Sequence, residues 1–227
     1  MPSVRFSAGI SKERLFVKRL KVSNNVIRRL PRYLRKLDEL AGNGVSRISS
    51  FELGQQLGLT PSQIRQDFSC FGEFGQQGYG YNVNTLLAEI KTILAITHPY
   101  NAIIVGAGNI GTALANFDGF EQEGFIIKAL FDVKEELLGT EIDGKPVYHI
   151  DEMERYVQEN NITIGVIAAR RSVAQGIADR MVASGIKGIW NFAPMDVTAT
   201  VPVENIHMTD SLICLMYKMH HNVISEN

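Results

Sequence analysis

The chain has 227 residues, of which 45% are hydrophobic and 21% are charged, a composition typical of a folded globular protein. It contains no apolar run of the about 18 residues that a membrane span needs. The N-terminus lacks the long apolar core and small-residue cleavage site of a signal peptide. The two cysteines, Cys70 and Cys214, fit a reducing compartment and supply no zinc-binding spacing. We therefore expect a cytoplasmic protein of two domains, with no membrane partner and no metal.

Charge is distributed unevenly along the chain. Residues 1–85 carry 13 Lys and Arg against 6 Asp and Glu, whereas residues 86–227 carry 10 against 18. A basic front half and an acidic back half favour contact between the front half and a polyanion. The alternative is that charge simply varies between two domains.

Residues 1–24 are basic, show no clear element, and predict a flexible arm. Residues 25–41 predict a helix whose apolar face carries Ile27, Leu30, Leu34, Leu37 and Leu40. Pro31 lies inside this pattern and predicts a kink or a late helix start. Basic side chains occupy the other positions, and the candidate DNA contacts among them are Arg28, Arg29 and Arg32.

Two short helices are predicted next. Residues 49–52, Ser-Ser-Phe-Glu, form a capping box, and the helix that they open ends at Gly58. Residues 60–63, Thr-Pro-Ser-Gln, form a second box with proline at the first helical position. Two such helices joined by a glycine-containing turn predict a helix-turn-helix.

The second of these helices is the expected recognition helix, with Ile64 and Phe68 pointing inward. Glutamine can hydrogen-bond adenine edges and arginine guanine edges in the major groove. The candidate DNA-reading residues are Ser62, Gln63, Arg65 and Gln66.

Residues 71–81 are rich in glycine and aromatic side chains and predict the tip of a β-hairpin. Such a wing would lie along the DNA backbone or in the minor groove, with Gln76, Gln77 and Tyr79 as candidate contacts. The alternative for the front half is a helical hairpin that serves as a dimer or regulatory module.

Residues 99–206 alternate between strand-length apolar runs and helical stretches, which predicts a parallel sheet wound with helices. Capping boxes are expected at residues 151–154 and 172–175. The predicted strands are residues 101–106, 125–132, 146–150, 163–169, 188–192 and 201–206.

The first of these strands runs into a glycine motif, whose residues are Gly106, Ala107, Gly108, Asn109, Ile110 and Gly111. Gly106 permits the tight turn, Gly108 lets the backbone approach a pyrophosphate, and Gly111 lets the helix pack near the strand. Asp132 ends the second strand, where a carboxylate accepts hydrogen bonds from a ribose and repels a 2′-phosphate. The motif predicts NAD(H) binding rather than NADP(H) binding, and the alternative is another nucleotide, such as coenzyme A, or none.

We find no catalytic apparatus beside this predicted cofactor site. No histidine is placed beside a carboxylate as a dyad, although the chain has His98, His149, His207, His220 and His221. Arg170 and Arg171 follow the fourth strand, where they are either solvated or hold a substrate carboxylate or cofactor phosphate. We expect no catalytic residues and no enzyme activity.

Five stretches carry a resemblance to a known family: VIRRLPRYLRKLDEL, SQIRQDFSCFGEFGQQGYGYNV, VGAGNIGTALANF, GIKGIWNFAP and VPVENIHMTDSL. In order and spacing they resemble the Rex family of bacterial redox-sensing transcriptional repressors, over about residues 25–220. The resemblance implies a winged-helix domain at 25–85, a Rossmann domain at 86–209, and a C-terminal helix in 210–227 that swaps into the partner of a homodimer. It also implies binding to palindromic double-stranded operator DNA when NAD+ is high, and release when NADH rises.

The resemblance assigns further residues. Near the cofactor it points to Val133, Ala169, Asn191 and Phe192. The switch between states would involve Phe117, His207 and Met208. Some members have Tyr at the position of Phe117 and Asp at that of His207, and many have Lys in place of Gln66, so the switch contacts and the operator of this chain differ from theirs.

Two other functions remain open on these residues. One is a small NAD-dependent oxidoreductase with a basic accessory domain, which a substrate-dependent change in NADH absorbance would reveal. The other is a regulator that binds coenzyme A or another nucleotide, for which coenzyme A would compete with bound NADH.

Overall fold

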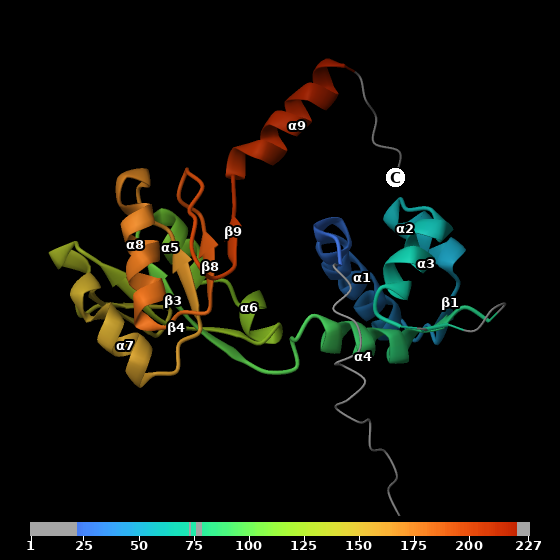
Figure 1. Cartoon of the computed structure of the whole chain (residues 1–227), viewed down its shortest axis with the longest axis horizontal. Helices are drawn as coiled ribbons and strands as arrows, with labels where there is room; N and C mark the ends of the chain where they lie inside the picture. The colour runs from blue at the N-terminus through green and yellow to red at the C-terminus, as the bar shows by residue number, and fades with distance from the viewer. Residues whose placement is uncertain (1–21, 73, 76–78, 222–227) are drawn as a thin grey trace, which may run out of the picture. The chain divides into compact units, whose positions relative to one another are not determined.

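A computed structural model describes residues 22–72, 74–75 and 79–221, and the chain divides into two compact units (Figure 1). The first unit extends to Ala95 and the second begins at Ile96. The predicted boundary at 85/86 falls inside helix α4 (Val83–Ile93). This helix stays with unit 1 because it packs on α1 (Asn24–Gly42) through a face that includes Leu86 and Ile90. Most of the predicted arm, residues 1–21, lies outside the described residues.

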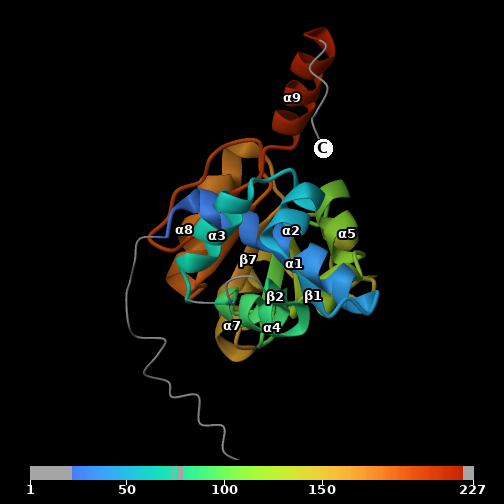
Figure 2. The same ribbon diagram turned by 90° about the vertical axis from the view of Figure 1, so that its right-hand side faces the viewer.

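Unit 1 is a helical domain with a two-stranded sheet (Figure 2). Helix α1 confirms the predicted helix, starts at its Ser23 cap and keeps Pro31 inside. One predicted core residue is wrong, because Ile27 is 47% exposed and Val26 and Tyr33 are buried instead. Positions 26, 30, 33 and 37 recur at helical spacing on one side of α1, and residue 27 lies off that stripe. The remaining elements of unit 1 are β1 (Arg47–Ile48), α2 (Ser50–Leu57), α3 (Pro61–Ser69), β2 (Tyr81–Asn82) and α4.

The helix-turn-helix is confirmed. Helix α2 opens with a reciprocal capping box, in which Ser49 accepts from the backbone of Glu52 and the Glu52 carboxylate accepts from Ser49. These hydrogen bonds lower the pKa of Glu52. Helix α2 ends at Gly58, whose φ of 64° is left-handed and suits glycine. Thr60 caps helix α3, and its hydroxyl accepts from the Gln63 backbone. The Gln63 side chain donates to Asp67 instead, so only half of the predicted second box forms.

We expect Ser49→Ala to reduce the free energy of unfolding of unit 1 by about 1 kcal/mol, because the first turn of α2 loses its acceptor. Urea unfolding of the full chain, followed by a probe in unit 1, measures this loss. Ser46→Ala changes an exposed serine in the preceding loop and should shift the midpoint little. Equal effects of the two substitutions would contradict a specific role for the cap.

The predicted wing leads into strand β2. Strand β2 pairs antiparallel with β1, with Arg47 opposite Asn82 and Ile48 opposite Tyr81. Four of residues 71–80 lie outside the described residues, so the hairpin tip at 71–81 stays a prediction. The ring of Tyr81 packs edge-on against Phe68 at 5.2 Å, which ties this segment to α3. Gln76 and Gln77 lie outside the described residues.

Unit 2 is a seven-stranded sheet in the order β5-β6-β4-β3-β7-β8-β9, parallel except for the edge strand β5. All six predicted strands are present, and β5 is additional. The strands are β3 (Tyr100–Val105), β4 (Phe125–Asp132), β5 (Glu141–Ile142), β6 (Lys145–His149), β7 (Ile164–Ile167), β8 (Gly188–Asn191) and β9 (Val203–Asn205).

Helices cover both faces of this sheet, as the βαβ alternation predicts (Figure 1). Helices α7 (Met153–Glu159) and α8 (Arg171–Ser184) cover one face with residues such as Met153 and Met181. Helices α5 (Asn109–Ala115) and α6 (Gly119–Gln122) cover the other. The short 3-10 turns are η2 (Glu135–Leu137) and η3 (Ile150–Glu152).

The two capping boxes predicted in unit 2 do not form. Helix α7 begins after η3 without a side-chain cap, and Glu154 instead pairs with Arg180 of α8 at 2.6 Å. This hydrogen bond from Arg180 lowers the pKa of Glu154. Helix α8 begins at Arg171, also without a side-chain cap.

Helix α9 (Met208–His220) starts two residues before the predicted C-terminal segment. Every residue of α9 is exposed, including Leu212, Ile213 and Met216. Among the described residues, no helix has the length and apolar character needed to cross a membrane.

Candidate functional site

The glycine motif lies at the carboxyl end of β3 with the geometry that the sequence predicts. Gly106 has a φ of 107°, and a Cβ there would overlap the carbonyl oxygen of Ala168. A Cβ on Gly111 would overlap the carbonyl oxygen of Gly106, which keeps α5 close to its strand. Gly108 is different, because nothing lies within 4 Å of the position that its Cβ would take. The turn is therefore tight on the inside and open at Gly108, where a ligand can approach the backbone.

Asp132 at the end of β4 is fixed against this turn. Its carboxylate accepts from the backbone N–H of Ala107 at 2.7 Å, Val133 at 2.8 Å and Lys134 at 3.1 Å. An ionised carboxylate has about four acceptor positions, so one remains for a ligand hydroxyl. The carboxylate of Asp132 is thus oriented by the backbone of the glycine motif and of the residues that follow β4.

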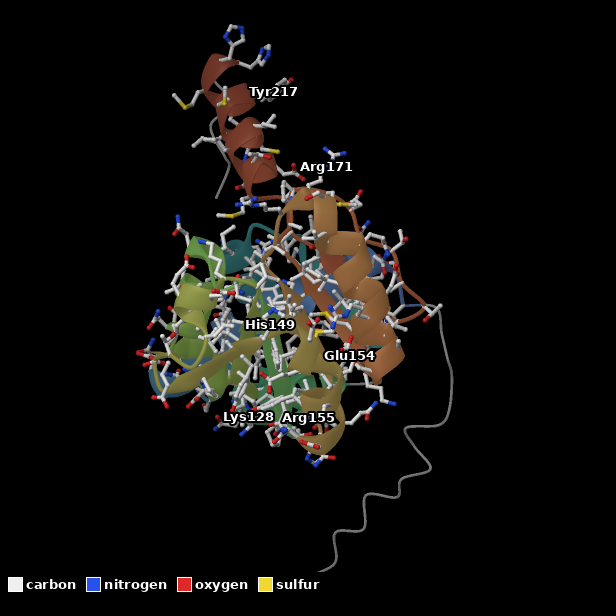
Figure 3. The ribbon with its side chains drawn as sticks, turned by 90° about the vertical axis from the view of Figure 1, so that its left-hand side faces the viewer. Lys128, His149, Glu154, Arg155, Arg171 and Tyr217 are labelled. Carbon is white, nitrogen blue, oxygen red and sulfur yellow. The ribbon has the colours of Figure 1, made fainter. Side chains whose placement is uncertain are left out.

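His149 is a neighbour of Asp132 that the sequence reading left unassigned. It ends β6 (Figure 3) and, in the parallel register, lies opposite Asp132. Its Nδ1 lies 3.3 Å from both the backbone nitrogen and the Oδ2 atom of Asp151. Val133 directly follows Asp132 in the chain, and its side chain is exposed. Position at the end of the strand next to β4 is the signal that could have identified His149.

The residues predicted near the cofactor after β7 and β8 differ in their exposure. Ala169 follows β7 beside Gly106 and is partly exposed. Phe192 is also partly exposed and packs on Trp190 at 4.6 Å. Asn191 is fully buried, and its amide donates to the Met195 carbonyl and to Oδ1 of Asn205 and accepts from the Ala193 N–H. These contacts hold the loop that follows β8, and the predicted contact of Asn191 with the cofactor stays a prediction.

The three predicted switch residues do not meet within one chain. Phe117 follows α5, which runs back from the carboxyl edge, and with Phe120 and Phe125 it lines a cavity of about 250 Å³ at the start of β4. His207 follows the carboxyl end of β9, and its Nε2 lies 2.8 Å from Oδ1 of Asp196. Met208 is 65% exposed. Phe117 therefore lies near the amino ends of the strands and His207 near their carboxyl ends.

Arg171 and Arg170 lie at the start of α8, at the same carboxyl edge as the glycine motif (Figure 3). Both side chains are exposed. In the part of the chain that the structure describes, no three His, Cys, Asp or Glu side chains are grouped for a metal ion.

The exposed face of α3 carries three of the predicted DNA-reading residues, Ser62, Arg65 and Gln66. Arg65 donates to the hydroxyls of Ser50 at 2.9 Å and Ser62 at 3.3 Å, which holds its guanidinium at the exposed N-terminal side of both helices.

Arginines flank this face. Arg32 of α1 donates to the Leu57 carbonyl at 2.6 Å, and Arg28 is exposed on the same helix. Tyr79 is 68% exposed, and the guanidinium of Arg47 lies 5.9 Å from its ring. Sequence reading missed Arg47; its place in the strand that pairs with the wing is visible only in the fold.

A buried carboxylate joins the recognition helix to α1. Asp67 of α3 is fully buried and binds Arg29, Tyr33 and Gln63. Burial alone would raise the pKa of Asp67, but the hydrogen bonds from these three side chains outweigh it and lower the pKa. The bidentate pair with Asp67 uses two of the three nitrogens of the Arg29 guanidinium and joins α1 to α3; the predicted contact of Arg29 with DNA stays a prediction.

Comparisons with known proteins match both units. Residues 97–195 match the family model of a CoA binding domain, and residues 21–69 match that of a putative DNA-binding protein N-terminus. The chain is 47% identical over 203 residues to the redox-sensing transcriptional repressor Rex of Clostridium perfringens (strain SM101 / Type A), covering 88% of this chain and 96% of the relative. It is 52% identical over 200 residues to Rex of Clostridium botulinum (strain Hall / ATCC 3502 / NCTC 13319 / Type A), covering 87% and 95%.

Solved structures give the same result over most of the chain. The crystal structure of RSP in complex with beta-NAD+ and operator DNA matches with a TM-score of 0.85 and 47% identity, over 88% of this chain and 94% of that one. The complex of RSP with beta-NADH matches with a TM-score of 0.83 and 44% identity, over 90% and 97%.

Proposed function

This chain belongs to the Rex family of redox-sensing transcriptional repressors, and from that premise we propose that it is itself a repressor that binds operator DNA and is released by NADH. The observation that carries the proposal is the presence of two sites in one chain. Unit 1 presents an exposed recognition helix, and unit 2 presents a glycine turn that is open at Gly108 beside an oriented carboxylate.

NAD+ and NADH are the proposed effector ligands. The backbone of residues 106–111, including Ala107, Asn109 and Ile110, is suited to the pyrophosphate, because Gly108 leaves room for close approach. The remaining acceptor position of Asp132 suits a ribose hydroxyl, and its charge disfavours a 2′-phosphate. Val133 and His149 flank Asp132 in sequence and in the sheet, where the adenine half would lie.

Discrimination between the two ligands has to come from the nicotinamide end. NAD+ and NADH differ by one hydride and one positive charge on that ring, so contacts with the shared adenosine and pyrophosphate cannot separate them. Ala169 and Phe192, both partly exposed at the carboxyl edge, are the residues that we propose for this end. NADH must bind the DNA-incompetent state more tightly than the competent one, with a coupling of about 1–3 kcal/mol.

The proposed DNA contacts come from α3 and its surroundings. Ser62, Arg65 and Gln66 lie on the exposed face of α3 for base and phosphate contacts. Arg28, Arg32, Arg47 and Tyr79 are placed for the backbone, and Gln76 and Gln77 remain proposals for the wing. A two-fold homodimer would present two recognition helices to a palindrome. We place the protein in the cytoplasm, where it has access to both the genome and the NAD(H) pool.

The chain acts as a regulator and not as an enzyme in this proposal. Support comes from relatives of similar length that are named as repressors. In the alternative, an NAD-dependent oxidoreductase with a basic accessory domain, the pairs His149–Asp151 and His207–Asp196 would be the candidate proton-transfer groups.

Selection of bound fragments from genomic DNA, once with NAD+ and once with NADH, tests the proposal. We expect enrichment of a palindrome with NAD+ and a loss of about tenfold or more in affinity with NADH, as a coupling near 1.4 kcal/mol requires. Equal enrichment with both would leave a DNA-binding protein without redox control. No enrichment, together with substrate-dependent NADH oxidation, would favour the enzyme.

Competition by coenzyme A provides the control for ligand identity. A chain that senses NADH should retain bound NADH in excess coenzyme A. Displacement at equal concentrations would assign the glycine motif to a different nucleotide.

A further inference from the structure

The buried carboxylate of Asp67 has four donors around it. Oδ2 accepts from Arg29 Nε at 2.6 Å and from the Tyr33 hydroxyl at 2.7 Å. Oδ1 accepts from the second nitrogen of the Arg29 fork at 2.7 Å and from Nε2 of Gln63 at 2.9 Å. Asp67 itself has no exposed surface, whereas Gln63 is partly exposed. Gln63 is thus the one member of this cluster that belongs to the predicted DNA-reading set and stands on α3.

The chemistry of Asp67 fixes the orientation of the Gln63 amide. An ionised carboxylate only accepts hydrogen bonds, so the amide nitrogen of Gln63 must face it, and the flipped amide would place two acceptor oxygens together. One N–H of Gln63 is used on Asp67. The carbonyl oxygen and the second N–H of Gln63 are left for other partners. Their positions relative to the axis of α3 are fixed by the contact with Asp67.

Gln63 lies in the first turn of α3, because Pro61 is the first residue of the helix and Thr60 its cap. The N-terminal residues of a recognition helix are the ones that reach base edges in the major groove. A glutamine that offers one acceptor and one donor together matches the N6 and N7 edge of adenine.

We propose that Asp67 is a positioning residue for DNA specificity: without touching DNA, it holds the Gln63 amide in the orientation that reads an adenine. The inference rests on the proposed function, since it needs an operator. It adds that one base pair in each half-site is selected through a side chain buried in unit 1.

The Arg29 pair makes this arrangement compatible with a polyanion. A lone carboxylate on a recognition helix would repel phosphates, but the bidentate contact with Arg29 compensates the charge of Asp67. The same contact keeps Asp67 ionised, because it lowers the pKa against the opposing effect of burial. Asp67 therefore remains an acceptor for Gln63 across the physiological pH range.

A purely structural role makes a different prediction. If Asp67 only anchors α3 to α1, its loss should weaken binding to every sequence alike. If it orients Gln63, its loss should remove the preference at one base pair and leave the other preferences in place. Tyr33→Phe is the matched control, because it removes one hydrogen bond to Asp67 and leaves Gln63 untouched.

The test measures the affinity of the full-length protein, with NAD+ present, for an operator in which each base pair is varied in turn. We expect Gln63→Ala to reduce the preference for A·T at one position of each half-site by about tenfold. Asp67→Asn should reduce the base preference at the same position. The double variant should reduce that preference no further, because Gln63 is already disoriented. Tyr33→Phe should retain the wild-type profile.

Independent, additive effects of Gln63→Ala and Asp67→Asn would overturn the inference, as would a uniform loss at all positions. A wild-type protein that selects no operator at all would sink the proposed function and the inference with it.

A second measurement on the wild-type protein guards against a variant that fails to fold. Proton exchange of side-chain amides, read by NMR, should show the Gln63 amide exchanging about tenfold or more slowly than those of Gln55 and Gln56, which are exposed on α2. Exchange of all three at the same rate would show that Asp67 does not hold Gln63, and would overturn the inference.

Discussion

Gly108→Ala is expected to remove dinucleotide binding while leaving the fold of unit 2 intact. The backbone of Gly108 has a φ of −80°, which alanine adopts freely, and its added methyl group meets nothing within 4 Å. The same methyl group occupies the space through which a pyrophosphate reaches the backbone. We expect at least a tenfold weaker affinity for both NAD+ and NADH, which corresponds to about 1.4 kcal/mol.

Thermal unfolding with and without NADH measures this effect, because a ligand that binds only the folded state raises the midpoint. The variant should unfold like the wild type without ligand and lose most of the NADH-induced rise. A full rise in Gly108→Ala would mean that the dinucleotide binds elsewhere.

Two other glycines provide matched controls for that experiment. Gly111→Ala should lower stability without ligand by about 1–3 kcal/mol, because its methyl group overlaps the Gly106 carbonyl. Gly176→Ala lies in α8 with open space around it and should raise stability by about 0.5–1 kcal/mol with ligand affinity unchanged.

Arg29→Ala is expected to destabilise unit 1 by about 3–5 kcal/mol, because it leaves Asp67 buried without its ion pair. Hydrogen exchange of the α1 and α3 amides measures this loss, and NADH binding to unit 2 should persist. Arg35→Ala, which removes an exposed arginine from the same helix, should change stability by no more than about 0.5 kcal/mol. A small effect of Arg29→Ala would show that the remaining donors suffice for Asp67.

The pH dependence of the Arg29→Ala loss has a definite sign. In the wild type the pKa of Asp67 is lowered, so its contribution to stability is present above the ordinary range of an aspartate and is lost as the pH falls through the lowered pKa. In Arg29→Ala the buried, unpaired carboxyl should have a raised pKa and regain stability as the pH falls. The difference in stability between the two proteins should therefore shrink toward acid pH.

The sheet and the glycine motif could be predicted from the sequence because their signals are local. The run at 125–132 is a buried strand of the length and composition that a parallel sheet requires, and the structure has a strand over those residues. The three glycines and Asp132 follow from their spacing relative to two such strands. Each of these predictions depended only on the pattern of residues close together in the sequence.

The features that the sequence does not reveal involve partners that are distant along the chain or used within a loop. Arg29 looked like one more basic residue on a helix, because nothing near it announces the carboxylate 38 residues away. Asn191 matched a motif beside the cofactor, but its amide is used within the loop after β8. The pairing of Tyr81 with Ile48 of β1 is another contact between distant residues that no local pattern announces.

Because of helix α9, operator binding by this protein should depend on its concentration in the cell. Its 13 residues are all exposed, with apolar side chains such as Leu212 and Met216 among them, and an isolated helix of that length is marginal in water. In the proposed homodimer its order depends on association, and association depends on concentration by mass action. Dilution below the dissociation constant would separate the two recognition helices whatever the ratio of NADH to NAD+. The number of chains in the cell would then set an upper limit on how many operators are occupied. The ratio of NADH to NAD+ would change operator occupancy only below that limit.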